Sequence, residues 1–129
     1  MKIVICEPGK HPYVKEIDGE LKTMQALVEG NIQVIYPFDD LAALVCNEEG
    51  LFLDIPWNRF LETHGPIKGT FFIAGIDSED FCSLTEAQTA TYLKEFWEIH
   101  RIEMDEEGLS VFILDDGTTP PQRGQVGRD

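Results

Sequence analysis

Residues 69–76 read GTFFIAGI, the most strand-like run in the chain. The run is rich in β-branched and aromatic residues, which favour strands. Gly69 and Gly75 lie near its two ends, where glycine is typical of a bend or of a close backbone approach. We therefore predict a strand here and place the rest of the fold around it.

Other strands are predicted on both sides of this run, at residues 2–6, 12–17, 31–36 and 109–114. The first two are separated by a Glu-Pro-Gly turn signal and predict a hairpin. Residues 41–46 (LAALVC) form a continuous apolar run that fits either a buried strand or a helical turn. The Asn-Glu-Glu-Gly sequence that follows is typical of a hairpin turn and favours the strand, with a short strand at residues 51–53 after it.

Two helices are predicted. In the first, Leu21, Met24, Leu27 and Val28 recur at helical spacing, and Gly30 stands where a left-handed C-terminal residue is expected. The second follows two overlapping capping boxes, Ser83 with Glu86 and Thr85 with Gln88. Its predicted apolar face extends as far as His100, and residues 103–108 (EMDEEG) are predicted to form an acidic turn. One broad face is shared by the following residues: Ala87, Ala90, Leu93, Phe96, Trp97 and His100.

The expected fold is α+β: a mainly antiparallel sheet of about five to six strands with two helices. A chain of 129 residues is long enough for one compact domain, which we place at residues 1–114. Residues 115–129 are rich in glycine and proline and predict a mobile C-terminal tail.

Composition excludes several classes of protein. No apolar run approaches the roughly eighteen residues of a membrane span, and the N-terminal sequence lacks the pattern of a signal peptide. We therefore expect a cytoplasmic protein. The chain has three cysteines, Cys6, Cys46 and Cys82. Because their number is odd and none are at CxxC spacing, they indicate free thiols rather than a disulfide framework or a metal site.

The net charge is −14, and it is unevenly distributed. Residues 39–116 hold eighteen acidic and four basic side chains, whereas residues 1–36 hold five and four. Such a charge repels nucleic acid and anionic membranes and attracts basic protein surfaces. The other interpretation of this charge is that it only keeps the protein soluble.

The candidate acidic interaction surface consists of carboxylates from two segments. Residues 77–80 lack the glycine and distal glutamate of a calcium loop, so we predict a solvated loop rather than a metal site. The members of the surface are Asp77, Glu79, Asp80, Glu103, Asp105, Glu106 and Glu107.

No motif in the chain indicates a reaction: Walker, GxGxxG, HExxH and GxSxG patterns are all missing from the sequence. Cys82 precedes the second predicted helix and could form a Cys–His nucleophile with His64 or His100, but a buried thiol in a capping loop is the better interpretation. We predict no catalytic residue, no cofactor and no metal.

The candidate ligand-binding residues are Trp57, Asn58 and Arg59, in a predicted loop at residues 54–68. An arginine beside an amide and an indole could hold an anion or a planar ring. The alternative is structural: Arg59 pairs with Asp54 or Glu62, and Asn58 caps a short helical turn.

Several motifs together resemble a known family. IVICEPGK, NEEG, the Pro-x-Asn-Arg of residues 56–59, GTFFI and DFCSLTEAQ are similar in order and spacing to domain of unknown function 3846, over roughly residues 1–97. The resemblance implies a small protein of phages and conjugative elements of Gram-positive bacteria. It carries no activity that can be assigned to particular residues.

Two functions are therefore considered. In the first, the chain is a non-enzymatic accessory protein of a mobile genetic element and binds a basic host protein, such as a nucleic-acid-binding or defence protein, through its acidic surface. In the second, it binds a nucleotide or another anion at Trp57, Asn58 and Arg59. Neither requires nucleic acid or membrane as a direct partner, and both leave the oligomeric state open.

Overall fold

A six-stranded antiparallel sheet forms the centre of the protein, which we describe over residues 1–122 from a computed structural model. The order of five strands is β2-β1-β7-β4-β3. The sixth strand, β8, pairs with the C-terminal part of β7, at residues 75–77. The strands are β1 (Lys2–Cys6), β2 (Tyr13–Glu16), β3 (Ile32–Ile35), β4 (Ala42–Asn47), β7 (Phe71–Asp77) and β8 (Asp80–Cys82). The predicted α+β class, with its antiparallel sheet and two helices, is confirmed.

The predicted strand at residues 69–76 corresponds to β7, the middle strand of the sheet. It pairs with β1 on one side and with β4 on the other. Both faces of these three strands are covered, which explains why KIVIC, LAALVC and FFIA are apolar without alternation. The ambiguity at residues 41–46 is thereby resolved in favour of a strand.

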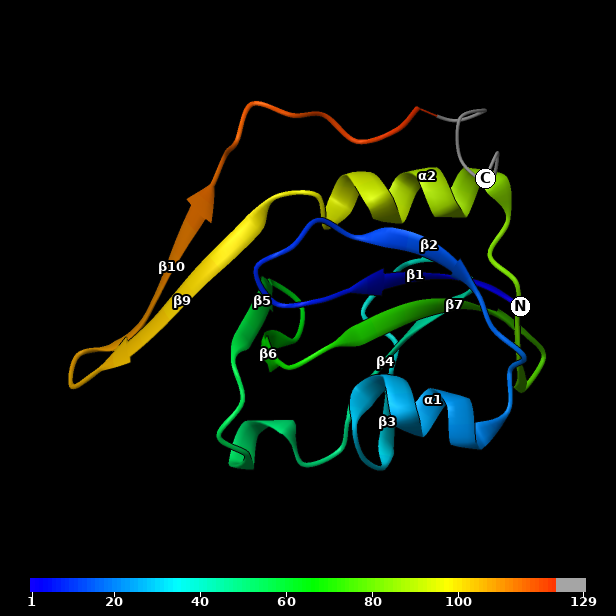
Figure 1. The fold of residues 1–129 in the computed structure, drawn as a ribbon, viewed down its shortest axis with the longest axis horizontal. Helices are drawn as coiled ribbons and strands as arrows, with labels where there is room; N and C mark the ends of the chain where they lie inside the picture. Colours follow the sequence, from blue (N-terminus) through cyan, green and yellow to red (C-terminus); the bar gives the residue numbers. More distant parts are fainter. Residues whose placement is uncertain (123–129) are drawn as a thin grey trace.

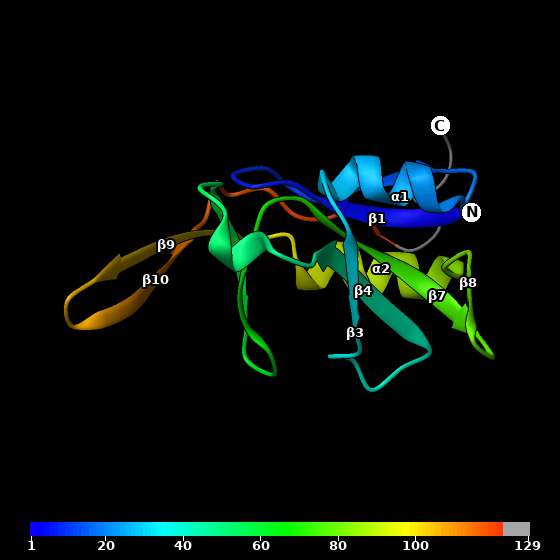
Figure 2. The same cartoon turned by 90° about the horizontal axis from the view of Figure 1, so that it is seen from below.

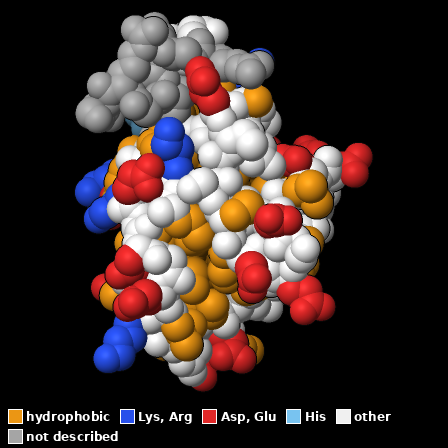
Figure 3. Space-filling view, turned by 90° about the vertical axis from the view of Figure 1, so that its right-hand side faces the viewer, with side chains coloured by type: hydrophobic (Ala, Val, Ile, Leu, Met, Phe, Trp, Pro, Cys, Tyr) orange, Lys and Arg blue, Asp and Glu red, His pale blue; other side chains and the backbone are white. Residues whose placement is uncertain are grey.

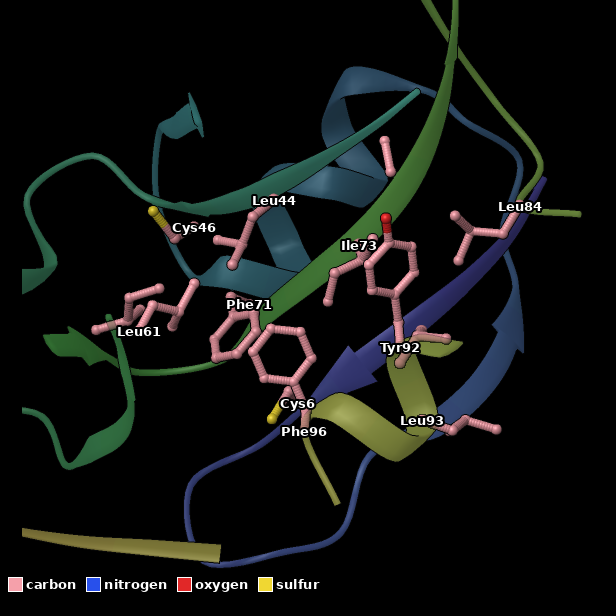
Figure 4. Packing of buried hydrophobic residues seen from close by; sticks show 13 residues of the cluster. Cys6, Leu44, Cys46, Leu61, Phe71, Ile73, Leu84, Tyr92, Leu93 and Phe96 are labelled. Atoms are coloured by element: carbon pink, nitrogen blue, oxygen red, sulfur yellow. The ribbon is translucent and has the colours of Figure 1, made fainter. Parts of the chain in front are cut away.

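The two helices lie on opposite faces of the sheet (Figure 1). Helix α1 (Leu21–Val28) covers the face that presents Ile3, Ile5 and Phe72. Helix α2 (Glu86–Glu95) covers the other face, where the largest core cluster lies (Figure 4). In that cluster the Phe71 and Phe96 rings meet edge to face, with their centroids 5.3 Å apart.

Helix α1 ends differently from the prediction. The left-handed residue is Glu29, with φ of 60°, rather than Gly30. Gly30 is needed for close approach instead, because a Cβ there would lie 2.6 Å from Asn47 Nδ2. The Asn47 amide donates to the carbonyls of Val28 and Glu29 and so satisfies the end of the helix.

Helix α2 begins at the second of the two predicted capping boxes. The Thr85 hydroxyl accepts from the Gln88 amide at 3.1 Å, and the Gln88 side chain accepts from the Thr85 amide at 2.9 Å. The helix ends at Glu95, so the prediction that it continues to His100 is wrong. His100 belongs to strand β9, in which the apolar residues Ile102 and Met104 follow it at every second position.

Two hairpins lie outside the main sheet. Strands β5 (Trp57–Leu61) and β6 (Gly65–Lys68) occupy the segment that was predicted to be a loop. Strands β9 (Ile99–Asp105) and β10 (Gly108–Leu114) form a seven-pair hairpin that projects from the body in two views (Figures 1 and 2). Residues 50–52 form a 3₁₀ turn, η1 (Gly50–Phe52), in place of the predicted short strand.

The segment after β10 returns to the body. His11 stacks on Trp97 with ring centroids 4.0 Å apart, and its Nε2 lies 2.6 Å from Asp116 Oδ2. Its Nδ1 lies 2.6 Å from the Trp97 carbonyl, so the ring donates to both acceptors only when it is protonated. Thr118 accepts from the Trp97 indole at 3.1 Å. Residues 115–118 are thus hydrogen-bonded, whereas residues 123–129 of the predicted tail lie outside the described part of the chain.

Within residues 1–122, no helix has the length and apolar character needed to cross a bilayer.

Candidate functional site

Asn58 and Arg59 lie in strand β5 and are buried, with Arg59 only 1% exposed. The structure therefore differs from the predicted loop and from the predicted helical cap. Trp57 is half-buried beside them, and the Lys68 ammonium lies 4.8 Å from the centre of its ring.

The Arg59 guanidinium donates five hydrogen bonds, all to oxygens of uncharged groups. Nη2 reaches the Lys10 carbonyl at 2.7 Å and the Phe96 carbonyl at 3.0 Å, and Nε reaches Phe96 again at 3.3 Å. Nη1 donates to the Asn58 carbonyl at 3.3 Å and to Asn58 Oδ1 at 2.8 Å. These bonds use all five guanidinium N–H groups, so Arg59 joins β5 to the β1–β2 loop and to the end of α2.

Asn58 completes this network. Its side-chain nitrogen, Nδ2, donates to the backbone carbonyls of Cys6 and Gly69, each at 2.8 Å. Its Oδ1 accepts from Arg59 and, at 3.7 Å, from the Cys6 thiol. Burial raises the pKa of this thiol to about 12, although the nearby Arg59 charge acts in the opposite direction. Cys6 is therefore a neutral member of the core.

The expected partners of Arg59 are not the observed ones. Asp54 and Glu62 are exposed, and the hydrogen bonds of Arg59 go to carbonyl and amide oxygens instead. Burial lowers the pKa of the Arg59 guanidinium. The geometry gives Arg59 a structural role, and the ligand-binding interpretation of Trp57, Asn58 and Arg59 stays a prediction.

A cavity of about 360 Å³ lies beside this network. Because the donors of Arg59 are already engaged and two carboxylates line the cavity, it offers an anion little attraction. Its lining consists of Pro37, Phe38, Arg59, Phe60, Leu61, Glu62, Thr63, Glu95, Phe96 and His100.

His100 connects this region to the projecting hairpin. Its Nδ1 accepts from the Phe60 amide at 3.0 Å, which attaches β9 to β5 and requires an unprotonated Nδ1. Burial and, secondly, the Arg59 charge lower the pKa of His100. The hairpin is thus fixed at its base by a neutral imidazole.

The predicted acidic surface is divided between two ends of the molecule. Asp77, Glu79 and Asp80 lie at the β7–β8 turn, and the carboxylates of residues 103–107 lie on the β9–β10 hairpin at the opposite end (Figures 1 and 2). On the end opposite the hairpin, carboxylates are scattered among apolar and basic side chains (Figure 3). The seven residues of the predicted surface therefore form two separate acidic clusters, one at each end, rather than one acidic face.

The β9–β10 hairpin, which we call the arm (residues 99–114), has one apolar face. Cross-strand partners share a face in an antiparallel ladder. Met104 pairs with Leu109, Val111 with Ile102, and Ile113 with His100, so five of these six positions are apolar. Ile102 is buried, but Met104 is 60% exposed and Ile113 57%.

The other face of the arm is mixed: it carries Arg101, Glu103, Asp105 and Ser110 beside Ile99, Phe112 and Leu114. Arg101 forms an ion pair with Glu103 at 3.3 Å, and its guanidinium carbon lies 4.6 Å from the centre of the Phe112 ring. Asp105, Glu106 and Glu107 form the exposed turn at the tip. The strand at residues 109–114 was predicted from the sequence, but its pairing with β9 was not, because the sequence of β9 was interpreted as the end of a helix and an acidic turn.

Comparison with known families identifies the domain. Residues 1–97 match the family described as Domain of unknown function (DUF3846). The chain belongs to the DUF3846 family. The match includes the Arg59 network and ends two residues before the arm. No curated protein and no solved structure matches this DUF3846 chain.

Proposed function

We propose that this DUF3846 protein is a non-enzymatic, cytoplasmic accessory protein of a phage or conjugative element, and that its arm binds a basic protein of a Gram-positive host. The observation that carries the proposal is the composition of the arm. An exposed apolar face and four carboxylates occupy one small element that extends from the body.

Apolar area and charge contribute differently to such an interaction. Burial of exposed Met104, Val111 and Ile113 supplies affinity through the hydrophobic effect. The carboxylates at the tip attract a basic surface and raise the rate of association, which falls with ionic strength. A host protein that binds nucleic acid has a surface of the complementary sign.

The two acidic clusters allow a matched test. The variant Glu103→Lys, Glu106→Lys, Glu107→Lys reverses three exposed charges on the arm. The variant Asp77→Lys, Glu79→Lys, Asp80→Lys changes the net charge by the same amount at the opposite end. Both would be immobilised beside the wild-type protein and exposed to a Gram-positive lysate at low and high salt, with bound proteins quantified by mass spectrometry.

We expect the wild-type protein and the β7–β8 variant to retain the same basic host proteins at low salt, and the arm variant to lose them. If no basic protein is retained, or if both variants lose binding equally, the proposal is wrong. Equal loss would show that only net charge matters.

A further inference from the structure

The outer edge of β10 is a seven-residue strand without any of the features that usually protect an edge. It pairs with β9 on one side, and no other strand among residues 1–122 pairs with it. Its sequence, GLSVFIL, contains no charged residue and no proline. Val111, Phe112, Ile113 and Leu114 are all exposed, from 37% to 57%. Exposed apolar edges of this length are the sites at which proteins add strands from other chains.

We propose that β10 binds its partner by strand addition, taking an extended segment in which apolar and basic residues alternate. This inference rests on the proposed function and specifies how the partner is recognised. The segment adds a third strand to the arm through main-chain hydrogen bonds to β10.

The two faces of the arm determine this alternation. Side chains of an added strand point alternately to the two faces. On one face they would lie beside Leu109, Val111 and Ile113, which requires apolar residues. On the other they would lie beside Ser110, Phe112 and Leu114 of β10, with Asp105 and the Arg101-paired Glu103 one strand further away. Lysine or arginine fits this face, because its apolar stem can lie on the Phe112 and Leu114 side chains while its charge extends towards these carboxylates.

The carboxylates are near enough to contribute. An added strand lies two strand spacings from β9, roughly 10 Å, which is about one Debye length at 0.1 M salt. Long basic side chains shorten that distance further, since a lysine or arginine stem lies along the sheet surface.

Charge also argues against a second copy of this chain as the occupant. A pair of β10 strands in antiparallel alignment brings the acidic tip of one copy towards Asp115 and Asp116 at the base of the other. Each copy carries a net charge of −14, so the two repel one another. A basic strand encounters no such repulsion.

A pair of synthetic peptides tests the mode of binding. One alternates lysine with valine and isoleucine over eight residues, and the other has the same composition with its apolar and lysine residues in separate blocks. Both carry the same charge, so electrostatic attraction alone binds them equally. Affinity would be measured by fluorescence anisotropy, and contacts between peptide amides and β10 by nuclear Overhauser effects.

We expect the alternating peptide to bind at least about tenfold more tightly than the block peptide, with interchain contacts along residues 108–114. The variant Val111→Thr with Ile113→Thr keeps β-branched residues and the net charge, and should remove this preference. Ser110→Thr, on the opposite face, should not alter it. Circular dichroism would verify that each variant is folded.

The outcomes separate this inference from the proposed function. Equal binding of both peptides, without contacts to β10, refutes strand addition and leaves charge-driven binding intact. Binding of neither peptide contradicts both proposals. Self-association through β10, seen by sedimentation as a dimer that Val111→Thr with Ile113→Thr abolishes, would refute the choice of a basic partner.

Discussion

Replacing Arg59 tests whether its buried network holds the protein together. Arg59→Met keeps much of the side-chain volume and removes every donor. The carbonyls of Lys10 and Phe96 would then lose the hydrogen bonds that Arg59 donates to them.

The expected loss in the free energy of unfolding follows from these two acceptors. The bond to the Phe96 carbonyl is buried and the bond to the Lys10 carbonyl is part-buried, so loss of the donor costs about 1–3 kcal/mol at the first and no more than that at the second, or at most about 6 kcal/mol together. Removing a buried charge recovers part of its desolvation cost, so a net loss of about 2–4 kcal/mol is expected. Arg59→Lys should fall between the wild-type protein and Arg59→Met, because one ammonium cannot reproduce the planar fork of donors.

Urea unfolding at 25 °C, followed by circular dichroism and tryptophan fluorescence, measures this loss. Arg101→Met is the matched control, since Arg101 is exposed and its ion pair with Glu103 should contribute less than about 1 kcal/mol. If Arg59→Met is no more destabilising than Arg101→Met, the structural role is wrong and the ligand-binding interpretation becomes the stronger one.

Two further predictions concern His100 and the start of α2. Because the pKa of His100 is lowered in the folded state, the unfolded chain takes up its proton first, and stability should fall as pH decreases from about 6.5 through the folded pKa. Thermal unfolding of the wild-type protein at a series of pH values should show this dependence of stability on pH. The variant His100→Phe should reduce the dependence, whereas the control His64→Gln, at an exposed position, should not. An unchanged dependence in His100→Phe would exclude His100 as its source. Thr85→Ala should cost about 1 kcal/mol through loss of the capping box, whereas Thr91→Ala, a hydroxyl in the middle of the same helix, should be neutral or slightly stabilising. Equal urea midpoints for the two variants would mean that the cap contributes nothing.

The sequence was informative where one local signal dominated. GTFFIAGI and the Thr85–Gln88 capping box predicted β7 and the start of α2, because each depends on neighbouring residues alone. In the arm, β10 was predicted as a strand, but β9 was missed for the opposite reason. His100 continues the helical spacing of Phe96 and Trp97 about as well as it fits a strand, and only the distant pairing with β10 decides between the two.

The candidate site shows the same limit. The sequence alone indicated that Arg59 had either a ligand or a carboxylate partner, because it lies in a predicted loop with Asp54 and Glu62 nearby. The observed partners are carbonyls of Lys10 and Phe96, which are 49 and 37 residues away in the chain. Backbone acceptors leave no trace in side-chain identity, so this network could not be predicted. The acidic interaction surface stays a prediction, and the division of its residues between two ends depends on the sheet topology.

Hydrogen exchange is the most direct test of partner binding by the arm. Amide exchange would be followed by mass spectrometry in the free protein and in its complex with the basic host protein that is most enriched by capture. If the arm binds the partner, new protection should be confined to residues 99–114 and should be strongest in β10. Protection centred on the β7–β8 turn or around the Arg59 cavity, with the arm unchanged, would contradict binding by the arm.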